Sequence, residues 1–224
     1  MTDFTLDHDR EARLGFDEAV YAAGKTAAQV AAIVAHVQAR QGRLLLTRLD
    51  ADRHAQLPEE QRALLDYDPL SRTAILGELV EPAGEPSVAI VSAGTSDLAV
   101  VREAQRTLAY HGQGARVIID AGVAGLWRLL RHEAELRCHA VVIVVAGMDA
   151  ALPSVVGGLV GGVVIAVPTS VGYGVAAEGR AALHAALASC APGVVVVNVD
   201  NGYGAACAAL RVVAPRLAER ERAR

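Results

Sequence analysis

Residues 194–210 read VVVVNVDNGYGAACAAL, and this stretch sets the pattern for most of the chain. An apolar run over 194–199 predicts a buried strand, the polar and glycine residues after it predict a turn, and small residues from about Tyr203 predict a helix. Unpaired backbone N–H groups at such a helix start favour an anion. Cys207 lies in the first turn or two, where the helix dipole favours the thiolate. On these residues alone, core packing is the favoured role for Cys207, ahead of nucleophilic attack.

The same unit of strand, glycine-containing turn and helix recurs through residues 87–224. Four earlier apolar runs also predict strands, over residues 88–94, 116–120, 140–147 and 163–168. Five strands alternating with five helices predict an α/β fold, a doubly wound parallel five-stranded sheet of flavodoxin-like or Rossmann-like order. Composition agrees: 53% of the residues are hydrophobic and only 4% are aromatic, and small aliphatic side chains suit strands buried on both faces.

Residues 1–86 are more highly charged and predict a separate, small mixed α+β domain of unknown role. Thr26 is a candidate N-cap for a helix that ends at Gly42, and a weaker helical signal begins at Asp17. Further along, the pattern predicts short strands at 44–49 and 73–80, a short helix at 58–65 and a turn at 66–72. The prolines and glycine of EPAGEP (81–86) predict a linker to the second domain, residues 87–224.

Bulk properties exclude several classes of function. The 224 residues carry a net charge of −4, which gives no nucleic-acid-binding footprint. Three widely spaced cysteines do not form a disulfide framework, so a cytoplasmic location is expected, and Cys138 and Cys190 are interpreted as structural. The charged N-terminus is unlike a signal peptide, and the apolar run at 155–168 is too short to span a membrane. Four histidines show no metal-ligand spacing and are interpreted as surface residues: His111, His132, His139 and His184.

The residues that follow the predicted strands point to a ligand site. Parallel strands end at one edge of their sheet, and ligands of doubly wound folds bind there. All five following segments contain glycine, and most contain hydroxyl, carboxylate or amide side chains, so a nucleotide or phosphosugar site is expected. Asp97 and Asp120 fit helix capping equally well, and the charge of Asp149 is favoured by its helix start alone. The candidate binding residues are Ser92, Gly94, Thr95, Ser96, Asp97, Asp120, Gly147, Met148, Thr169, Ser170, Gly172, Tyr173, Asn198, Asn201, Gly202 and Gly204.

Several of these segments resemble one protein family. SAGTSDLAV (92–100), VAGMDAALPSVVGGLV (145–160), VIAVPTSVGYG (164–174) and VVNVDNGYGA (196–205) are similar to motifs of the LarB family. That family is the carboxylase/hydrolase of nickel-pincer nucleotide biosynthesis and is related to PurE-type aminoimidazole ribotide carboxylases. The resemblance extends into the first domain, at DREARLGFDEAVYAAGKT (9–26) and LLTR (45–48).

The resemblance implies an enzyme with a defined reaction. LarB-type enzymes carboxylate the pyridinium ring of nicotinic acid adenine dinucleotide at C5 with CO2 and cleave the phosphoanhydride. The products are pyridinium-3,5-biscarboxylic acid mononucleotide and AMP, on the route to the nickel-pincer cofactor used in lactate racemase maturation.

Residue roles follow from the same resemblance. The family's catalytic cysteine falls shortly after the motif NxDNGxGA, which gives Cys207 that role and reverses the interpretation from local chemistry. A thiolate that adds to the ring makes an enamine carbon able to attack CO2, and a base then removes the C5 proton. Asp149 is the candidate base and Asp200 the second candidate, although the family usually has Glu at the first of these positions. A glycine pair is also expected where this chain has Glu178 and Gly179.

The resemblance further implies a homo-oligomer, an octamer in PurE-type relatives, and Mg2+ is a candidate for assisting phosphoanhydride cleavage although the sequence specifies no ligands for it. An aminoimidazole ribotide carboxylase or mutase is the alternative enzyme. That chemistry usually needs a histidine after the third strand, where this chain reads GMDAALP (147–153). A non-catalytic nucleotide-binding module with a regulatory N-terminal domain is the third reading, under which Cys207 is replaceable.

Overall fold

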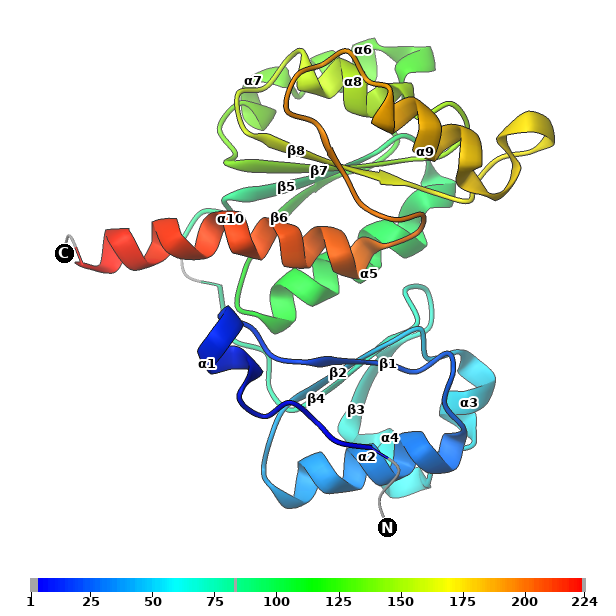
Figure 1. Ribbon diagram of the computed structural model, residues 1–224, viewed down its shortest axis with the longest axis vertical. Helices are drawn as coiled ribbons and strands as arrows, with labels where there is room; N and C mark the ends of the chain where they lie inside the picture. Colours follow the sequence, from blue (N-terminus) through cyan, green and yellow to red (C-terminus); the bar gives the residue numbers. More distant parts are fainter. Residues whose placement is uncertain (1–3, 83, 223–224) are drawn as a thin grey trace. The chain divides into compact units, whose positions relative to one another are not determined.

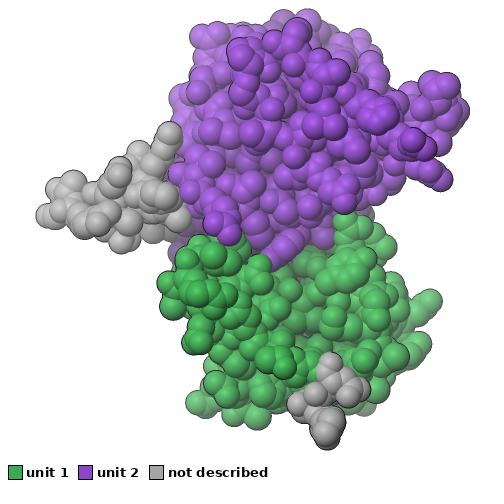
Figure 2. Space-filling model, viewed as in Figure 1, with its two compact units in different colours: residues 1–80 green, residues 81–224 purple. Residues whose placement is uncertain are grey.

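The computed structural model describes residues 4–82 and 84–222, with side chains through residue 213. The chain divides into two compact units, residues 1–80 and 81–224 (Figure 2). The second unit starts at the first residue of the segment 81–86. Among the described helices, none combines the length and the apolar character needed to cross a membrane.

Unit 1 contains a four-stranded mixed sheet in the order β1-β2-β4-β3 (Figure 1). Its strands are β1 (Ala19–Tyr21), β2 (Leu44–Thr47), β3 (Leu65–Asp68) and β4 (Thr73–Leu76). β1 pairs with β2 in parallel, and the other neighbours are antiparallel. Its helices are α1 (Arg10–Leu14), α2 (Ala27–Ala39), α3 (Ala51–Ala55) and α4 (Glu59–Leu64).

Helix α2 begins and packs as its sequence predicts. Thr26 Oγ1 accepts a hydrogen bond from Gln29 N (3.2 Å), and Thr26 N donates to Gln29 Oε1 (3.0 Å), so the two residues form a capping box. The apolar face of the helix is buried in the core of unit 1 together with Leu44 and Leu46 of β2. That face consists of Val30, Ile33, Val34 and Val37.

Two predictions for unit 1 were wrong, and both fell on short strands. The helical signal from Asp17 gives way to strand β1, which pairs with β2 through Ala19 and Leu45. The turn expected over 66–72 instead begins with strand β3, paired to β4 along its whole length. β2 and β4 are equally short but are buried throughout, so their apolar residues revealed them. β1 and β3 include exposed and half-buried residues, and their pairing across the sheet decides that they are strands.

Unit 2 confirms the predicted doubly wound fold. Its five strands are all parallel and lie in the order β6-β5-β7-β8-β9, the flavodoxin-like arrangement. The strands are β5 (Val88–Ser92), β6 (Ala115–Ile118), β7 (Val141–Ala146), β8 (Val163–Pro168) and β9 (Val195–Val196). The α-helices are α5 (Leu98–Tyr110), α6 (Trp127–Leu130), α7 (Glu133–Leu136), α8 (Ala151–Gly157), α9 (Arg180–Leu187) and α10 (Gly202–Arg222). Three short 3-10 helices join them, η1 (Thr95–Asp97), η2 (Val123–Gly125) and η3 (Gly174–Gly179).

The sheet of unit 2 is covered on both faces, as its apolar strands require. Helices α5 and α10 lie along one face, and α6 to α9 cover the other (Figure 1). Ile90, Ile143 and Ile165 face one another in register across β5, β7 and β8, and all three are fully buried. These strands carry branched aliphatic side chains on both faces because neither face meets water.

Two details of unit 2 differ from expectation. The one helix expected between the predicted strands at 116–120 and 140–147 is divided into η2, α6 and α7, with a break at Arg131 and His132 that no glycine or proline marks. The strand expected over 194–199 is reduced to β9, which pairs only with Ile165 and Ala166 of β8. β9 is an edge strand, so it forms hydrogen bonds with a neighbouring strand on one side only. The chain therefore leaves the sheet early.

The junction between η3 and α9 explains why a glycine pair is expected there. Glu178 and Gly179 both adopt left-handed backbone conformations, with φ of 61° and 72°. Glu178→Gly is therefore expected to stabilise the protein by about 1 kcal/mol, because the left-handed conformation costs a side-chain-bearing residue about that much. Chemical denaturation would measure the gain. Gly179→Ala should do the opposite, since its Cβ would lie 2.7 Å from Thr169 O and from Val199 Cγ1. A less stable Glu178→Gly variant would contradict this account.

Candidate active site

The residues predicted to bind a ligand lie around the point where the sheet of unit 2 changes its direction of winding. β6 pairs with one edge of β5, and β7 pairs with its other edge. The chain therefore continues from the end of β5 toward one face of the sheet and from the end of β7 toward the other face. Doubly wound proteins bind ligands at this point. The loops after β5 and β7 carry Ser92 to Asp97 and Gly147 to Asp149, and these candidates therefore flank it.

A buried hydrogen bond joins the loop after β5 to the loop after β8. Thr169 Oγ1 donates to Asp97 Oδ1 (2.7 Å), and Gly94 N donates to Asp97 Oδ2 (3.0 Å). Thr169 is fully buried and Asp97 is only 3% exposed. Burial raises the pKa of Asp97, the bonds from Thr169 and Gly94 oppose that rise, and the charge of Asp200 adds to it. Asp97 thus has both carboxylate oxygens engaged within the protein.

The loops after β7 and β8 are interlocked through Gly147. A Cβ at this position would lie 2.2 Å from Val171 O and 2.7 Å from Thr169 Oγ1, so only glycine fits. The next residue, Met148, donates its N–H to Val171 O (2.8 Å). Met148 and Ala150 both adopt left-handed backbone conformations, with φ of 54° and 44°. Such residues concentrate at functional sites, where the surrounding structure holds the strain.

The loop after β6 is attached to the loop after β5. Ala121 N donates to Ser92 O (2.9 Å), and a Cβ on Gly122 would lie 2.7 Å from Ala93 O. The carboxylate of Asp120 forms an ion pair with Arg128 (2.6 Å). This guanidinium had no role in the sequence interpretation, and it offers a fixed positive charge beside the predicted site.

The turn between β9 and α10 joins the same group of loops through Asp200. Its Oδ1 accepts a hydrogen bond from Ser170 N (2.8 Å), and its own N–H donates to Pro168 O (2.9 Å). Asp200 is left-handed, with φ of 56°. All five strand-end segments are therefore linked to one another, with residues 168–171 at the centre.

The start of helix α10 corrects one premise of the sequence interpretation. Its N–H groups were expected to be free for an anion, but Gly204 N donates to Asn201 Oδ1 (2.8 Å) and Tyr203 N donates to Glu103 Oε2 (3.2 Å). Gly202 is needed for close packing, since its Cβ would lie 2.4 Å from Val100 O of α5. The protein's own side chains thus occupy two N–H groups of this helix start.

Glu103 lies beside the start of α10, next to the candidate site, and was not among the residues predicted from the sequence. It lies on α5, is only 3% exposed, and caps a helix a hundred residues further along the chain. The sequence did contain a signal for this residue. A charged side chain lies one helical turn from Val100 and next to Ala104, on the helix face that packs inward, where charged residues are rarely buried without a partner.

The remaining candidates divide by exposure. Those whose side chains are exposed are Thr95, Ser96, Met148, Asp149, Ser170, Tyr173 and Asn198. The half-buried ones are Gly94, Asp120, Gly172, Asn201 and Gly204, and the buried ones are Ser92, Asp97, Gly147, Thr169 and Gly202. Asp149 lies just before α8, and its Oδ1 accepts a hydrogen bond from Ala151 N (3.4 Å). It thus presents an exposed carboxylate at the edge that holds the other candidates.

The three cysteines lie in different settings. Cys207 is half-buried in the second turn of α10, beyond the first turn where the helix dipole acts most strongly. Cys190 and Cys138, both interpreted as structural, are exposed. The neighbours of Cys190 contact α8: Ser189 Oγ lies 2.7 Å from Ser154 Oγ, and a Cβ on Gly157 would lie 2.8 Å from Ala191 Cβ.

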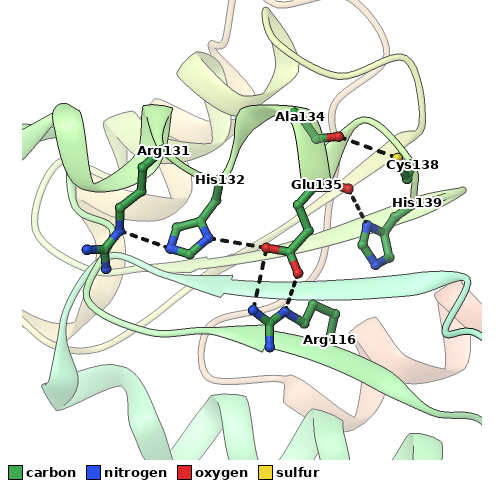
Figure 3. A network of polar contacts seen from close by, with 7 residues as sticks. All are labelled: Arg116, Arg131, His132, Ala134, Glu135, Cys138 and His139. Atoms are coloured by element: carbon green, nitrogen blue, oxygen red, sulfur yellow. Dashed lines mark hydrogen bonds and ion pairs between the residues drawn. The ribbon is translucent and has the colours of Figure 1, made fainter.

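Figure 3 shows a polar network around α7 and on the edge strand β6, with His132 just before α7 and His139 shortly after it. The Arg116 guanidinium donates to Glu135, which lowers the pKa of that carboxyl, and His132 Nδ1 lies 3.2 Å from Glu135 Oε2. Arg131 Nε donates to His132 Nε2 (3.1 Å), and His139 Nδ1 lies 3.0 Å from the carbonyl oxygen of Glu135. These contacts tie α7 to the sheet. Among the residues whose side chains the structure describes, 4–82 and 84–213, no group of three His, Cys, Asp or Glu side chains is placed to hold a metal ion.

The fold and these loops define a class, a flavodoxin-like parallel α/β protein with its candidate site at the strand ends. The family description "LarB/PurE-like N-terminal domain" matches residues 1–78, and "AIR carboxylase" matches residues 87–223. An uncharacterized protein of Methanocaldococcus jannaschii is 37% identical over 212 residues, covering 89% of this chain and 80% of that protein. A PurE2 variant from Treponema denticola has a crystal structure that matches with a TM-score of 0.49 and 22% identity, over 58% of this chain and 81% of that chain.

The chain belongs to the LarB family, which combines a LarB/PurE-like N-terminal domain with an AIR carboxylase domain. Its second unit is therefore a domain of the carboxylase type.

Proposed function

We propose that this protein carboxylates the pyridinium ring of nicotinic acid adenine dinucleotide with CO2 and hydrolyses the phosphoanhydride, giving pyridinium-3,5-biscarboxylic acid mononucleotide and AMP. Membership in the LarB family is the observation that carries the proposal. The linked strand-end loops support it, because exposed hydroxyls at Thr95, Ser96 and Ser170 suit the phosphate and ribose groups of a dinucleotide.

The proposed chemistry needs a thiolate and a base. The thiolate adds to the electrophilic ring and gives a dihydropyridine, whose enamine carbon C5 attacks CO2 to form the new C–C bond. A base takes the proton from C5, the electron pair returns to the ring, and expulsion of the thiolate restores the aromatic pyridinium. Water then cleaves the phosphoanhydride. Asp149 is the proposed base, since it is exposed at the strand-end edge, and Asp200 is the second candidate although its Oδ1 is engaged by Ser170.

Cys207 is the proposed nucleophile, because it follows the NxDNGxGA motif of the family resemblance and lies in the second turn of α10, which starts at the strand-end turn. Cys190 is more exposed. It precedes β9, however, so it lies at the edge of the sheet where the strands begin, and its neighbours contact the later part of α8, away from Asp149. Exposure alone therefore does not make Cys190 a nucleophile for the strand-end site.

A divalent ion and an assembly complete the proposal. The described residues supply no cluster of protein ligands for Mg2+, so an ion that shields the phosphoanhydride would be held mainly by the substrate's phosphates. The carboxylation steps proposed for the protein's own residues do not involve this ion. A homo-octamer is proposed from the resemblance to PurE-type relatives, and light scattering in solution would test it.

Asp149→Asn is expected to slow carboxylation about 100-fold while nucleotide binding changes little, because the amide cannot accept the C5 proton. Product formation is followed by mass spectrometry and binding by calorimetry. Asp149→Glu is the matched control. It keeps a carboxylate at this position, on the Glu side chain that the family usually has, and should retain turnover. An equal loss of binding and turnover would instead make Asp149 a residue that orients the ligand.

The direct test of the function is turnover of nicotinic acid adenine dinucleotide and bicarbonate, with the dicarboxylated mononucleotide and AMP detected by mass spectrometry. Aminoimidazole ribotide is offered in parallel, because the match to "AIR carboxylase" makes purine-type carboxylation the second candidate. Turnover of the ribotide alone would favour that reading. Binding without turnover of either substrate would favour a non-catalytic nucleotide-binding module.

A further inference from the structure

Two aspartates from different loops hold adjacent residues of the loop after β8. Asp97 Oδ1 accepts a hydrogen bond from Thr169 Oγ1 (2.7 Å), and Asp200 Oδ1 accepts one from Ser170 N (2.8 Å). Asp200 N also donates to Pro168 O (2.9 Å). Residues 168–170 are therefore held from the loop after β5 and from the turn before α10.

Of these two aspartates, Asp97 is the more deeply buried. Its second oxygen accepts from Gly94 N (3.0 Å), it is 3% exposed, and its partner Thr169 is fully buried. Thr169 Oγ1 also borders Gly147, where a Cβ would approach it to 2.7 Å. One carboxylate thus fixes the loop after β8 against the loops after β5 and β7.

We infer that Asp97 is a positioning residue, whose carboxylate keeps these three loops in the register that lets Thr95, Ser96 and Ser170 bind the anionic groups of a nucleotide. The nucleotide in this inference rests on the proposed function, whereas the loop register does not. Asp97 is therefore assigned a role in the arrangement of the site that exists before any substrate binds.

The ionisation of Asp97 supplies a signature that a purely structural residue lacks. Burial raises its pKa, and Asp200, from the turn before α10, is the charged group that faces it. As the pH falls through that raised pKa, the carboxyl gains a proton and one of its oxygens changes from acceptor to donor. Thr169 must then accept instead of donate. Asparagine at position 97 has one donor group and one acceptor group at every pH, so it resembles the protonated acid.

The first test measures hydrogen exchange of the full-length protein without substrate. In Asp97→Asn at neutral pH, amides of residues 146–150 and 168–172 should exchange about ten-fold faster, as expected when a hydrogen bond to a charged group is weakened. After correction for intrinsic exchange rates, the exchange of wild type at low pH should approach that of the variant. The corrected exchange of the variant itself should not change with pH. Thr169→Val removes only the hydroxyl and should raise exchange similarly, without adding to the effect of Asp97→Asn in the double variant.

A matched control is available in unit 1. Asp68 Oδ2 accepts from Ser71 Oγ (2.5 Å) and from Ser71 N (3.3 Å), the same kind of aspartate–hydroxyl pair outside the site. Asp68→Asn should leave exchange over residues 168–172 and turnover unchanged. Unchanged exchange in Asp97→Asn, or additive effects of the two site variants, would overturn the inference.

The second test uses substrate. For nicotinic acid adenine dinucleotide, Asp97→Asn should raise KM about ten-fold and change kcat much less, because it disturbs binding loops and not reacting groups. Equal changes in kcat and KM would also overturn the positioning role. If exchange responds as expected but the dinucleotide is not turned over by wild type, the positioning role stands and the proposed function fails.

Discussion

Removal of the nucleophilic thiol is expected to lower turnover of nicotinic acid adenine dinucleotide about 1,000-fold or more, because covalent catalysis has no substitute for the attacking group. Cys207→Ala should carry this loss, because Cys207 has the position that the family resemblance implies, near the strand-end turn. Cys190→Ala should retain turnover, because Cys190 is exposed but precedes β9, at the edge of the sheet where the strands begin. Turnover is measured by mass spectrometry of the dicarboxylated mononucleotide and AMP.

The third cysteine provides a second control. Cys138 is exposed next to the end of α7, where its Sγ contacts the carbonyl oxygen of Ala134 (3.4 Å), and Cys138→Ala should retain full turnover. Thermal unfolding of each variant shows whether the fold is intact. Intact-protein mass spectrometry of wild type during turnover should detect an adduct that is lost only in the inactive variant. Full activity in both Cys207→Ala and Cys190→Ala would rule out the covalent mechanism.

The sheet of unit 2 was predictable because its three central strands are long apolar runs. Val88–Ser92, Val141–Ala146 and Val163–Pro168 are buried almost throughout, so hydrophobicity alone marks them, and the alternation with helices fixes parallel pairing. β1 and β3 of unit 1 lacked such runs, since their residues include exposed and half-buried positions. Pairing partners distant in sequence decide such strands.

The location of the candidate site was predictable for the same reason, because parallel strands deliver their following loops to one edge. The roles of individual residues were not. Asp97 and Thr169 are 72 residues apart, and Glu103 and Tyr203 are 100 apart, so their hydrogen bonds leave no local pattern. Free N–H groups at the start of α10 were expected from geometry that ignores such partners. What the sequence suggests as a ligand contact can therefore be a contact within the protein.

Gly147→Ala tests the arrangement of the loops most severely. We expect it to lower the free energy of unfolding by about 2–3 kcal/mol, because an added methyl group that meets fixed atoms must displace them. The Cβ would lie 2.2 Å from the backbone oxygen of Val171 and 2.7 Å from Thr169 Oγ1, and the latter is held by Asp97. Chemical denaturation measures the loss, and turnover should fall with it because the loop that carries Asp149 is displaced.

Gly161→Ala is the matched control, because it adds the same methyl group in the same unit where, apart from its chain neighbours, nothing lies within 4 Å of the new Cβ. Its stability should stay within about 0.5 kcal/mol of wild type. The comparison separates steric exclusion from the general effect of replacing glycine, which acts on the unfolded chain in both variants. Equal stabilities for the two variants would mean that the loops after β7 and β8 do not interlock. The proposed site would then lose the rigid frame on which both the thiolate chemistry and the positioning role of Asp97 depend.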